Sequence, residues 1–210
     1  MYWIGGGSGA GKSTVARSLA TAHGLRLYAT DDAMADHARR AAPRDAPLLH
    51  AFMVMDRDQR WVERSPGTML ATFPWFEGEG FELIVEDLLG LPVDQAVIVE
   101  GFRLLPSAVK PLLADISRAL WLLPTPEFRR HAFESRGALW DIAGRTTRPD
   151  VALANLLERD RLFTDRLRER TDGLGLPAMT VDGSVDETTL VAAVADRFGL
   201  GSSPPREGHE

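Results

Sequence analysis

The chain of 210 residues contains no cysteine. Without thiols it has no disulfide bond, no thiolate metal site and no cysteine nucleophile. It also lacks an excess of positive charge, because 24 lysines and arginines stand against 30 acidic residues and give a formal net charge of -6. Surfaces that grip nucleic acid need clustered positive charge, so we expect no nucleic acid partner.

Long apolar segments are missing as well. The longest runs, such as Ala119 to Leu123, are far shorter than the ~20 residues with which a helix crosses a bilayer, so we expect no membrane contact. A first strand predicted to begin at residue 2 leaves no room for a signal peptide, and we expect a cytoplasmic protein. With 44% apolar residues, residues 1–200 are predicted to form one domain around a single core.

The chain does contain a complete phosphate-binding pattern. Residues 6–13 read G-G-S-G-A-G-K-S, which matches G-x-x-x-x-G-K-[ST] directly after a short apolar run and before an amphipathic helix. The pattern predicts a site for a nucleoside triphosphate. The residues expected around its phosphates are Gly7, Ser8, Gly9, Ala10, Gly11, Lys12, Ser13 and Thr14.

Each residue type in this pattern has a physical role. Glycines let the backbone approach the phosphates closely, so that consecutive N–H groups point at anionic oxygens. Lys12 is expected to place a positive charge at the β and γ phosphates, and Ser13 to offer a hydroxyl to Mg²⁺. The helix that begins near Gly11 directs the positive end of its dipole at the same oxygens.

Apolar segments alternate with helices along the chain, which predicts an α/β fold with a parallel sheet covered on both faces. A long helix is expected from Pro149 to about Thr171, with its arginines, Arg159 among them, mostly facing outward. Residues 201–210 are predicted to be a disordered tail. Five strands are expected, at Tyr2–Gly5, Leu25–Tyr28, Ala96–Val99, Ala119–Leu123 and Ala178–Val181, and two helices that end at glycines, at 12–23 and 187–198.

Nearly seventy residues separate the second and third strands, too many for a bare loop. Three helices are expected there. One begins at Ser65-Pro66, a favourable N-cap followed by proline at the first helical position. Another is expected to place one apolar face inward, formed by Phe81, Ile84, Val85, Leu88 and Leu89.

Two aspartates follow the second predicted strand, in Thr30-Asp31-Asp32. The carboxyl ends of parallel strands form the ligand crevice, so these carboxylates are expected to face the γ-phosphate. Asp31 or Asp32 could accept the proton of an attacking hydroxyl, and Asp31 could also help to hold Mg²⁺. The alternative is that they only cap the helix that follows.

The third predicted strand ends in Glu100-Gly101-Phe102-Arg103. A carboxylate at this strand end could orient Mg²⁺-bound water or the acceptor, and Arg103 could reach the substrate. The alternative is a simple turn with a solvated arginine.

Residues 6–13, Thr30-Asp31-Asp32 and Glu100-Gly101-Phe102-Arg103 together resemble the P-loop kinase superfamily, which includes nucleoside monophosphate kinases, shikimate and gluconate kinases and chloramphenicol phosphotransferase. The resemblance implies a three-layer fold with sheet order 2-3-1-4-5, ATP and Mg²⁺ as ligands, a substrate-binding insert and an arginine-rich lid. The insert would be residues 33–92 and the lid residues 126–150.

Two departures from the nucleoside monophosphate kinases affect the expected acceptor. Those enzymes typically place an arginine shortly after the acid that corresponds to Asp31 or Asp32, where this chain has Ala33-Met34-Ala35. They also carry the motif Asp-Gly-Phe-Pro-Arg, whereas this chain has Glu100-Gly101-Phe102-Arg103 without the proline. Both differences favour an acceptor with a free hydroxyl over a nucleoside monophosphate.

The resemblance also indicates residues around the transferring phosphoryl group and around the adenine ring of the nucleotide. Within the expected lid, Arg136 and Arg145 lie in loop-like surroundings and are preferred over Arg129, Arg130 and Arg148 on helix faces, although all could be ordinary surface arginines. Asp182, after the last strand, lies in a segment like the loop that borders adenine in these kinases. A plain strand-to-helix turn explains that segment nearly as well.

Aromatic residues are concentrated in the expected insert, together with acidic ones. A pocket of this character suits a hydrophobic or cationic acceptor, with Trp75 as a contact, although core packing is the better explanation for any single aromatic. The aromatic residues are Trp61, Phe73, Trp75, Phe76 and Phe81, and the acids Glu77, Glu79 and Glu82. The five histidines show no paired ligand spacing, so no metal site is expected beyond nucleotide-bound Mg²⁺.

These features predict a monomeric or homodimeric ATP-dependent phosphotransferase that acts on a hydroxyl of a small molecule, a metabolite or an antibiotic-like compound. Two alternatives remain. One is a nucleoside or nucleotide kinase, and the other is a regulatory ATPase that transfers nothing and binds a protein partner.

Overall fold

The computed structural model describes residues 1–136 and 138–201, and the side chains of residues 135–140 lie outside this description. Its centre is a five-stranded, all-parallel sheet of order β2-β3-β1-β4-β5. The strands are β1 (Tyr2–Gly6), β2 (Arg26–Ala29), β3 (Val97–Glu100), β4 (Ala119–Pro124) and β5 (Ala178–Val181). The predicted order is confirmed, and each strand boundary lies within one residue of its expected position.

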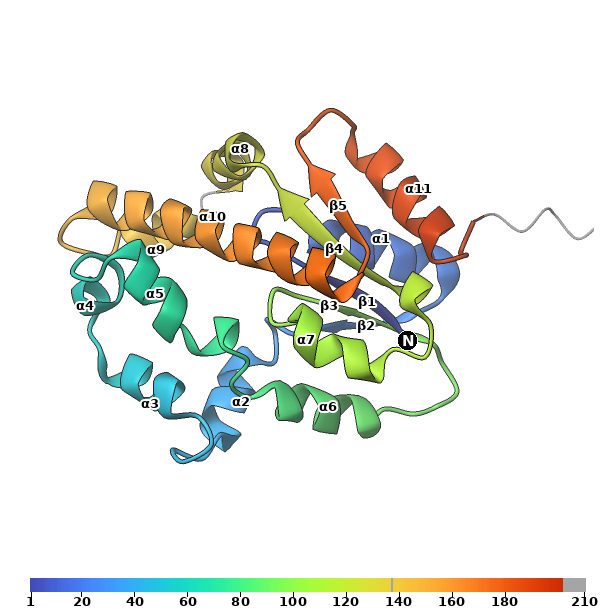
Figure 1. The fold of residues 1–210 in the computed structure, drawn as a ribbon, viewed down its shortest axis with the longest axis horizontal. Helices are drawn as coiled ribbons and strands as arrows, with labels where there is room; N and C mark the ends of the chain where they lie inside the picture. Colours follow the sequence, from blue (N-terminus) through green and yellow to red (C-terminus); the bar gives the residue numbers. More distant parts are fainter. Residues whose placement is uncertain (137, 202–210) are drawn as a thin grey trace, which may run out of the picture.

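Helices cover the sheet on both faces (Figure 1). On one face lie α1 (Lys12–His23) and α11 (Glu187–Arg197), which pack against each other. On the other lie α6 (Phe81–Leu89), α7 (Pro106–Val109) and the long α10 (Pro149–Leu174). Every residue of β3 and β4 is buried, as expected for central strands of a sheet covered twice.

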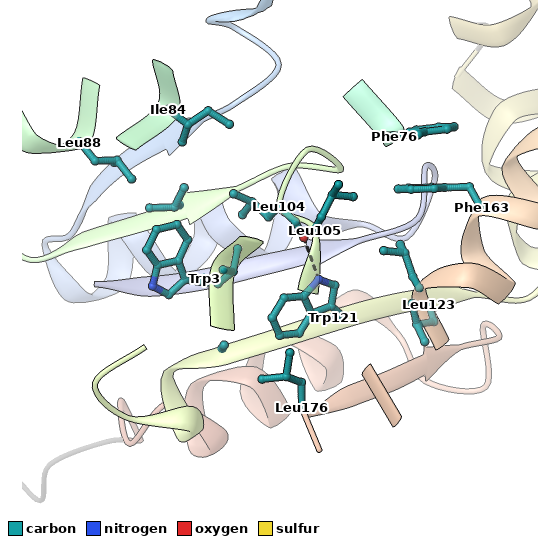
Figure 2. Packing of buried hydrophobic residues seen from close by; sticks show 14 of the residues in the cluster. Trp3, Phe76, Ile84, Leu88, Leu104, Leu105, Trp121, Leu123, Phe163 and Leu176 are labelled. Atoms are coloured by element: carbon teal, nitrogen blue, oxygen red, sulfur yellow. Dashed lines mark hydrogen bonds between the residues drawn. The ribbon is translucent and has the colours of Figure 1, made fainter. Parts of the chain in front are cut away.

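Large side chains fill the layer between the sheet and α10 (Figure 2). The ring of Phe76 stacks on Phe163 of α10 with centroids 3.7 Å apart. Trp121 of β4 is fully buried, and its indole N–H donates to the carbonyl oxygen of Leu104 at 2.8 Å, so this buried donor is satisfied. In the same cluster, Phe163 and Leu167 of α10 pack with Trp121 and Leu123 of β4, which fixes α10 over the sheet.

The segment between β2 and β3 contains α2 (Met34–Arg40), α3 (Pro47–Val54), α4 (Arg57–Trp61), α5 (Pro66–Thr72), the 3₁₀ helix η1 (Pro74–Phe76) and α6. The prediction of three helices was wrong, because local caps divide the segment more finely. Asp56 and Gln59 form a capping box at α4, and Ser65 accepts from the Thr68 N–H at α5 as predicted. Leu89 of α6 is 79% exposed, so it does not belong to the expected apolar face.

The remaining helices connect these parts. They are the 3₁₀ helices η2 (Lys110–Leu112) and η3 (Ile116–Arg118), followed by α8 (Pro126–Arg136) and α9 (Ala138–Ala143). The expected outward position of Arg159 in α10 was wrong, since only 6% of this residue is exposed. Residues 202–210 of the predicted tail lie outside the described residues. Within the described ranges, we find no helix with both the length and the apolar character of a membrane span.

The turn after β1 provides a test of the fold. Gly6 has a φ of 132°, and a Cβ atom there would collide with the backbone of Leu122. We expect Gly6→Ala to lower the free energy of unfolding by about 2–4 kcal/mol, because neither backbone can move without breaking the sheet. Urea denaturation measures the change.

Gly173→Ala is the matched control. Gly173 lies within α10 with no atom within 4 Å of the added Cβ, so alanine is expected to raise the free energy of unfolding by about 0.5–1 kcal/mol. Equal stability of the two variants would contradict this account of the turn.

Candidate active site

The loop between β1 and α1 has the backbone shape that its glycines allow. Gly9 and Gly11 have φ values of 79° and 80°, and Gly11 is the N-cap of α1. Gly7 donates its N–H to the carbonyl oxygen of Leu122 at 3.0 Å, which fastens the loop to β4. The N-terminus of α1 therefore opens at the carboxyl edge of the sheet, where an anion is favoured.

Lys12 lies inside this loop. Its side chain is 8% exposed, and Nζ donates to the carbonyl oxygen of Gly7 at 2.8 Å. Burial lowers the pKa of Lys12, while the negative charges of Glu100, Asp31 and Asp160 act in the opposite direction. The lysine is thus a desolvated cation surrounded by carboxylates.

Glu100 ends β3 next to β1 and is 3% exposed. The Ser13 hydroxyl donates to its carboxylate, and among the described residues its Oε2 has no hydrogen-bond partner. Burial raises the pKa of Glu100, an effect that the charge of Lys12 opposes. An orphaned carboxylate oxygen beside a serine hydroxyl is the kind of donor set that Mg²⁺ accepts.

Asp31 follows β2 and lines the same pocket as the loop, whereas Asp32 does not line it. Burial raises the pKa of Asp31, and Lys12 opposes this shift. The preceding Thr30 is fully buried, and its N–H donates to the carbonyl oxygen of Glu100 at 2.9 Å. A Cβ atom on Gly101 would collide with the Thr30 hydroxyl, so the glycine lets the ends of β2 and β3 meet.

One pocket of about 460 Å³ joins the loop to a chamber of aromatic side chains. Its loop end contains residues 8–13 and Asp31. Arg159 and Asp160 of α10 also line it. The aromatic and apolar lining consists of Met34, Phe52, Trp61, Phe73, Trp75, Phe76, Phe102, Phe133 and Ile142. This volume is within the usual range for small-molecule sites.

The acids that accompany these aromatics in the sequence do not line the chamber. Glu77 forms an ion pair with Arg166 at 2.5 Å. Glu79 accepts the N–H groups of Leu48 and Leu49, each at 2.8 Å, at the start of α3. These acids therefore tie helices together, and the expected acidic character of the pocket does not come from them.

Arg103 is placed behind the chamber. It is 2% exposed, its guanidinium lies 4.3 Å from the ring centroid of Trp75, and it donates to the carbonyl oxygens of Thr30 and Gly80 at 3.2 and 3.0 Å. Burial lowers its pKa to about 10. Trp75 lines the pocket and Arg103 supports it from the outer side.

Among the expected lid arginines, Arg129 reaches the phosphate loop. It is 1% exposed, and it donates to the carbonyl oxygen of Ser8 at 3.4 Å and to the hydroxyl of Thr164. Arg145 is exposed in a separate depression beside Trp61, and the side chain of Arg136 lies outside the described residues. Arg129 is one of the helix-face arginines that were not preferred from the sequence, and its position in the first turn after β4 is the signal that could have indicated it.

Asp182 follows β5 and does not line this pocket. Its carboxylate accepts the N–H of Ser184 at 2.9 Å, and this hydrogen bond lowers its pKa. Asp182 thus forms a local turn between β5 and α11, and its position beside an adenine ring stays a prediction.

A phosphate loop after the first strand of a 2-3-1-4-5 parallel sheet, with acids at the ends of β2 and β3, decides the fold. The chain has the three-layer P-loop NTPase fold. No family model matches it. Among curated proteins it is 25% identical over 187 residues to a 2-phosphoglycerate kinase of Methanocaldococcus jannaschii, which covers 84% of this chain. The chain spans just over half of that relative, 56% of its length.

Solved structures of P-loop kinases are similar to the chain over most of its length. The alignment with a gluconokinase from Sinorhizobium meliloti covers 94% of this chain and 90% of the gluconokinase chain, with 17% identity and a TM-score of 0.47. The alignment with a deoxyadenosine kinase from M. mycoides with bound dATP covers 94% of this chain and 97% of the deoxyadenosine kinase chain, with 11% identity and a TM-score of 0.49.

The buried cation at the loop yields a pH prediction. Because burial lowers the pKa of Lys12 from 10.5, nucleotide affinity should begin to fall at a pH below 10.5, as the free protein loses this proton. We expect Lys12→Ala to lose most nucleotide binding at every pH. Titration calorimetry with Mg-ADP across the alkaline range measures both effects.

Lys110, the other lysine of the chain, is the control, since its Nζ donates to the carbonyl oxygen of Leu174 far along α10. Lys110→Ala should bind the nucleotide as tightly as the wild type, and its affinity should fall in the same way at alkaline pH. The same pH profile in Lys12→Ala and the wild type would refute the assignment.

A second pair of neighbouring variants tests the arginine at the loop. We expect Arg129→Met to weaken Mg-ADP binding about tenfold, because it removes the donor that ties Ser8 to Thr164. Arg130→Met removes the same charge from an exposed neighbour and should change the affinity less than twofold. Equal losses in both variants would mean that only net charge matters here.

Proposed function

We propose that this protein is an ATP-dependent phosphotransferase that moves the γ-phosphoryl group of Mg-ATP to a hydroxyl of a small molecule. The observation that carries the proposal is the continuity of one pocket from the phosphate loop, past Asp31, into an aromatic chamber. Nucleotide and acceptor would thus meet at a carboxylate that can take a proton.

In this proposal the nucleotide phosphates bind the backbone N–H groups of residues 8–14, and Gly7, whose N–H donates to Leu122, holds the start of the loop in place. Lys12 neutralises the β and γ phosphates from inside the loop, where its low exposure strengthens the interaction. Asp182 remains our proposed contact on the adenine side.

Asp31 is the proposed general base. The acceptor hydroxyl gives its proton to a carboxylate oxygen of Asp31 as its oxygen bonds to the γ-phosphorus, and the bond from that phosphorus to the ADP oxygen breaks. Burial raises the pKa of Asp31, which makes its carboxylate a stronger base than an exposed aspartate. Asp32, outside the pocket wall, is the alternative base.

The chain's own residues fit Mg²⁺. Ser13 offers a hydroxyl, and Glu100 and Asp31 offer carboxylate oxygens, one of them unpartnered. Bound there with the nucleotide, Mg²⁺ would neutralise phosphate charge. Glu100 would hold the Ser13 hydroxyl in place.

Residues 33–92 are the proposed acceptor-binding insert and residues 126–150 the proposed lid. Arg129 is our principal candidate for stabilising charge on the transferring group, because it already contacts the loop. Arg136 and Arg145 remain candidates that a closing lid would have to bring in. Trp75 is the proposed acceptor contact, supported by Arg103. The similarity to a 2-phosphoglycerate kinase, at 25% identity, supports a small-molecule kinase.

The direct test is ADP release from Mg-ATP with a panel of nucleosides, nucleoside monophosphates, sugars, aminoglycosides and hydroxy acids, with mass spectrometry of each mixture. A compound that gains a phosphoryl mass and stimulates ADP release would establish the activity. Stimulation by nucleosides or monophosphates alone would favour a nucleotide-directed kinase. ADP release accelerated only by a protein would favour a regulatory ATPase.

The base assignment is tested by two neighbouring variants. Asp31→Asn should lower kcat by about 10²–10⁴-fold, because the amide cannot accept the proton, and should leave Mg-ADP binding nearly intact. Asp32→Asn should keep kcat within about threefold, because its side chain lies outside the pocket wall. On the acid side of the pH profile, the midpoint of the fall in kcat/KM should lie above pH 3.8, the ordinary pKa of aspartate. Burial raises the pKa of Asp31, so its carboxylate is protonated at a higher pH. If kcat fell further in Asp32→Asn than in Asp31→Asn, Asp32 would be the general base in place of Asp31.

A further inference from the structure

Two adjacent charged residues of α10 are buried in the wall of the pocket. Arg159 is 6% exposed and Asp160 is 1% exposed. The guanidinium donates from Nε and Nη2 to one oxygen of Asp160, Oδ1, at 2.8 and 2.6 Å. The two charges therefore neutralise one another inside the site.

Aromatic rings hold the guanidinium in place. Its central carbon lies 5.3, 5.0 and 5.2 Å from the ring centroids of Trp61, Phe73 and Phe76. These three rings belong to the segment between β2 and β3, and all three line the pocket. Cation–π contacts and the ion pair together give the arginine one fixed orientation.

The pair keeps unused hydrogen-bonding capacity. In the part of the chain that the structure describes, Nη1 of Arg159 and Oδ2 of Asp160 are buried without a hydrogen-bond partner. Buried polar atoms in this condition destabilise the folded state, and native proteins rarely retain them without a ligand or ordered water. Here both belong to residues that line the chamber facing Asp31.

We propose that the Arg159–Asp160 pair recognises the phosphoryl acceptor and selects an uncharged, ring-bearing compound with further hydroxyl or amide groups. This inference rests on the proposed kinase function and specifies its substrate class. The ring lies against the aromatic chamber, one polar group of the acceptor accepts from Nη1, and one donates to Oδ2.

The charge balance of the pair carries the selectivity. A one-to-one ion pair has no net charge to offer, so it cannot compensate a charged ligand group that leaves water. A carboxylate or phosphate would meet the free oxygen of Asp160, and an ammonium group would meet the free nitrogen of Arg159. Hydroxyl and amide groups supply the donor and the acceptor without adding charge.

Three matched probes separate these cases: 1-phenylethane-1,2-diol, mandelate and 2-amino-1-phenylethanol. They share a phenyl ring and a secondary hydroxyl and differ in one terminal group, which is neutral, anionic or cationic. Titration calorimetry on the full chain with Mg²⁺ and a non-hydrolysable ATP analogue gives the three affinities. We expect the diol to bind at least about tenfold more tightly than either charged probe.

Asp160→Asn tests the origin of this preference. The variant removes the negative charge and leaves the charge of Arg159 uncompensated. The affinity for mandelate relative to the affinity for the diol should therefore rise at least about tenfold. Asp165→Asn is the control on the same helix, because Asp165 pairs with Arg161 and Arg168 near the surface and does not line the pocket. It should leave the ratio unchanged.

Tighter or equal binding of a charged probe by the wild type would overturn the inference, as would no binding of any probe up to millimolar concentrations. An unchanged ratio in Asp160→Asn would also overturn it and would indicate that water satisfies the pair. If the diol binds with the expected preference but none of the panel compounds receives a phosphoryl group from Mg-ATP, the kinase proposal fails while the binding preference stands.

Discussion

The desolvated ammonium group of Lys12 is the constraint on which the site depends. A buried cation needs negative charge nearby, and Glu100, Asp31 and Asp160 provide it from β3, from the end of β2 and from α10. Glu100 and Asp31 are themselves partly desolvated, and the charge of the lysine stabilises both in turn, whereas Asp160 is already paired with Arg159. The charge balance around one side chain therefore draws three separate elements toward the phosphate loop.

Helix α10 connects this charged centre to the aromatic chamber. Its Thr164 accepts from Arg129, which contacts Ser8 of the loop, and a Cβ atom on Gly7 would lie 2.6 Å from the same hydroxyl. One turn earlier, Arg159 packs among the rings of the chamber. A single helix thus fixes the distance between the phosphate loop and the aromatic chamber, which the proposed in-line transfer would require.

The parts of this architecture that depend on local sequence were predictable. Apolar strand segments, the glycine-rich loop and the Ser65-Pro66 helix start are signals that neighbouring residues determine, and they agree with the structure. The burial of Arg159 was not predictable, because helical periodicity places an arginine outward unless distant rings surround it. The choice of Arg129 over other arginines likewise depends on a loop 121 positions away in the chain. Short helices between β2 and β3 were missed because several caps interrupt one apolar pattern.

The two ends of the β2–β3 segment are held by one cluster of charge contacts, and its middle is held differently. Burial alone would raise the pKa of Asp87 in α6, but hydrogen bonds from Arg40, Tyr28 and His37 hold it at about 2. This cluster ties α2 and α6 to β2 and so fixes the strand end that carries Asp31. In the chamber walls from α3 to η1, ring contacts, including Phe52 with Trp61 and Phe73, join the hydrogen bonds of Glu79 and Arg60. Directional charge contacts position Asp31, the proposed base, whereas less directional ring packing shapes the aromatic chamber, so the proposed chemistry and the proposed acceptor preference rest on separable parts of the fold.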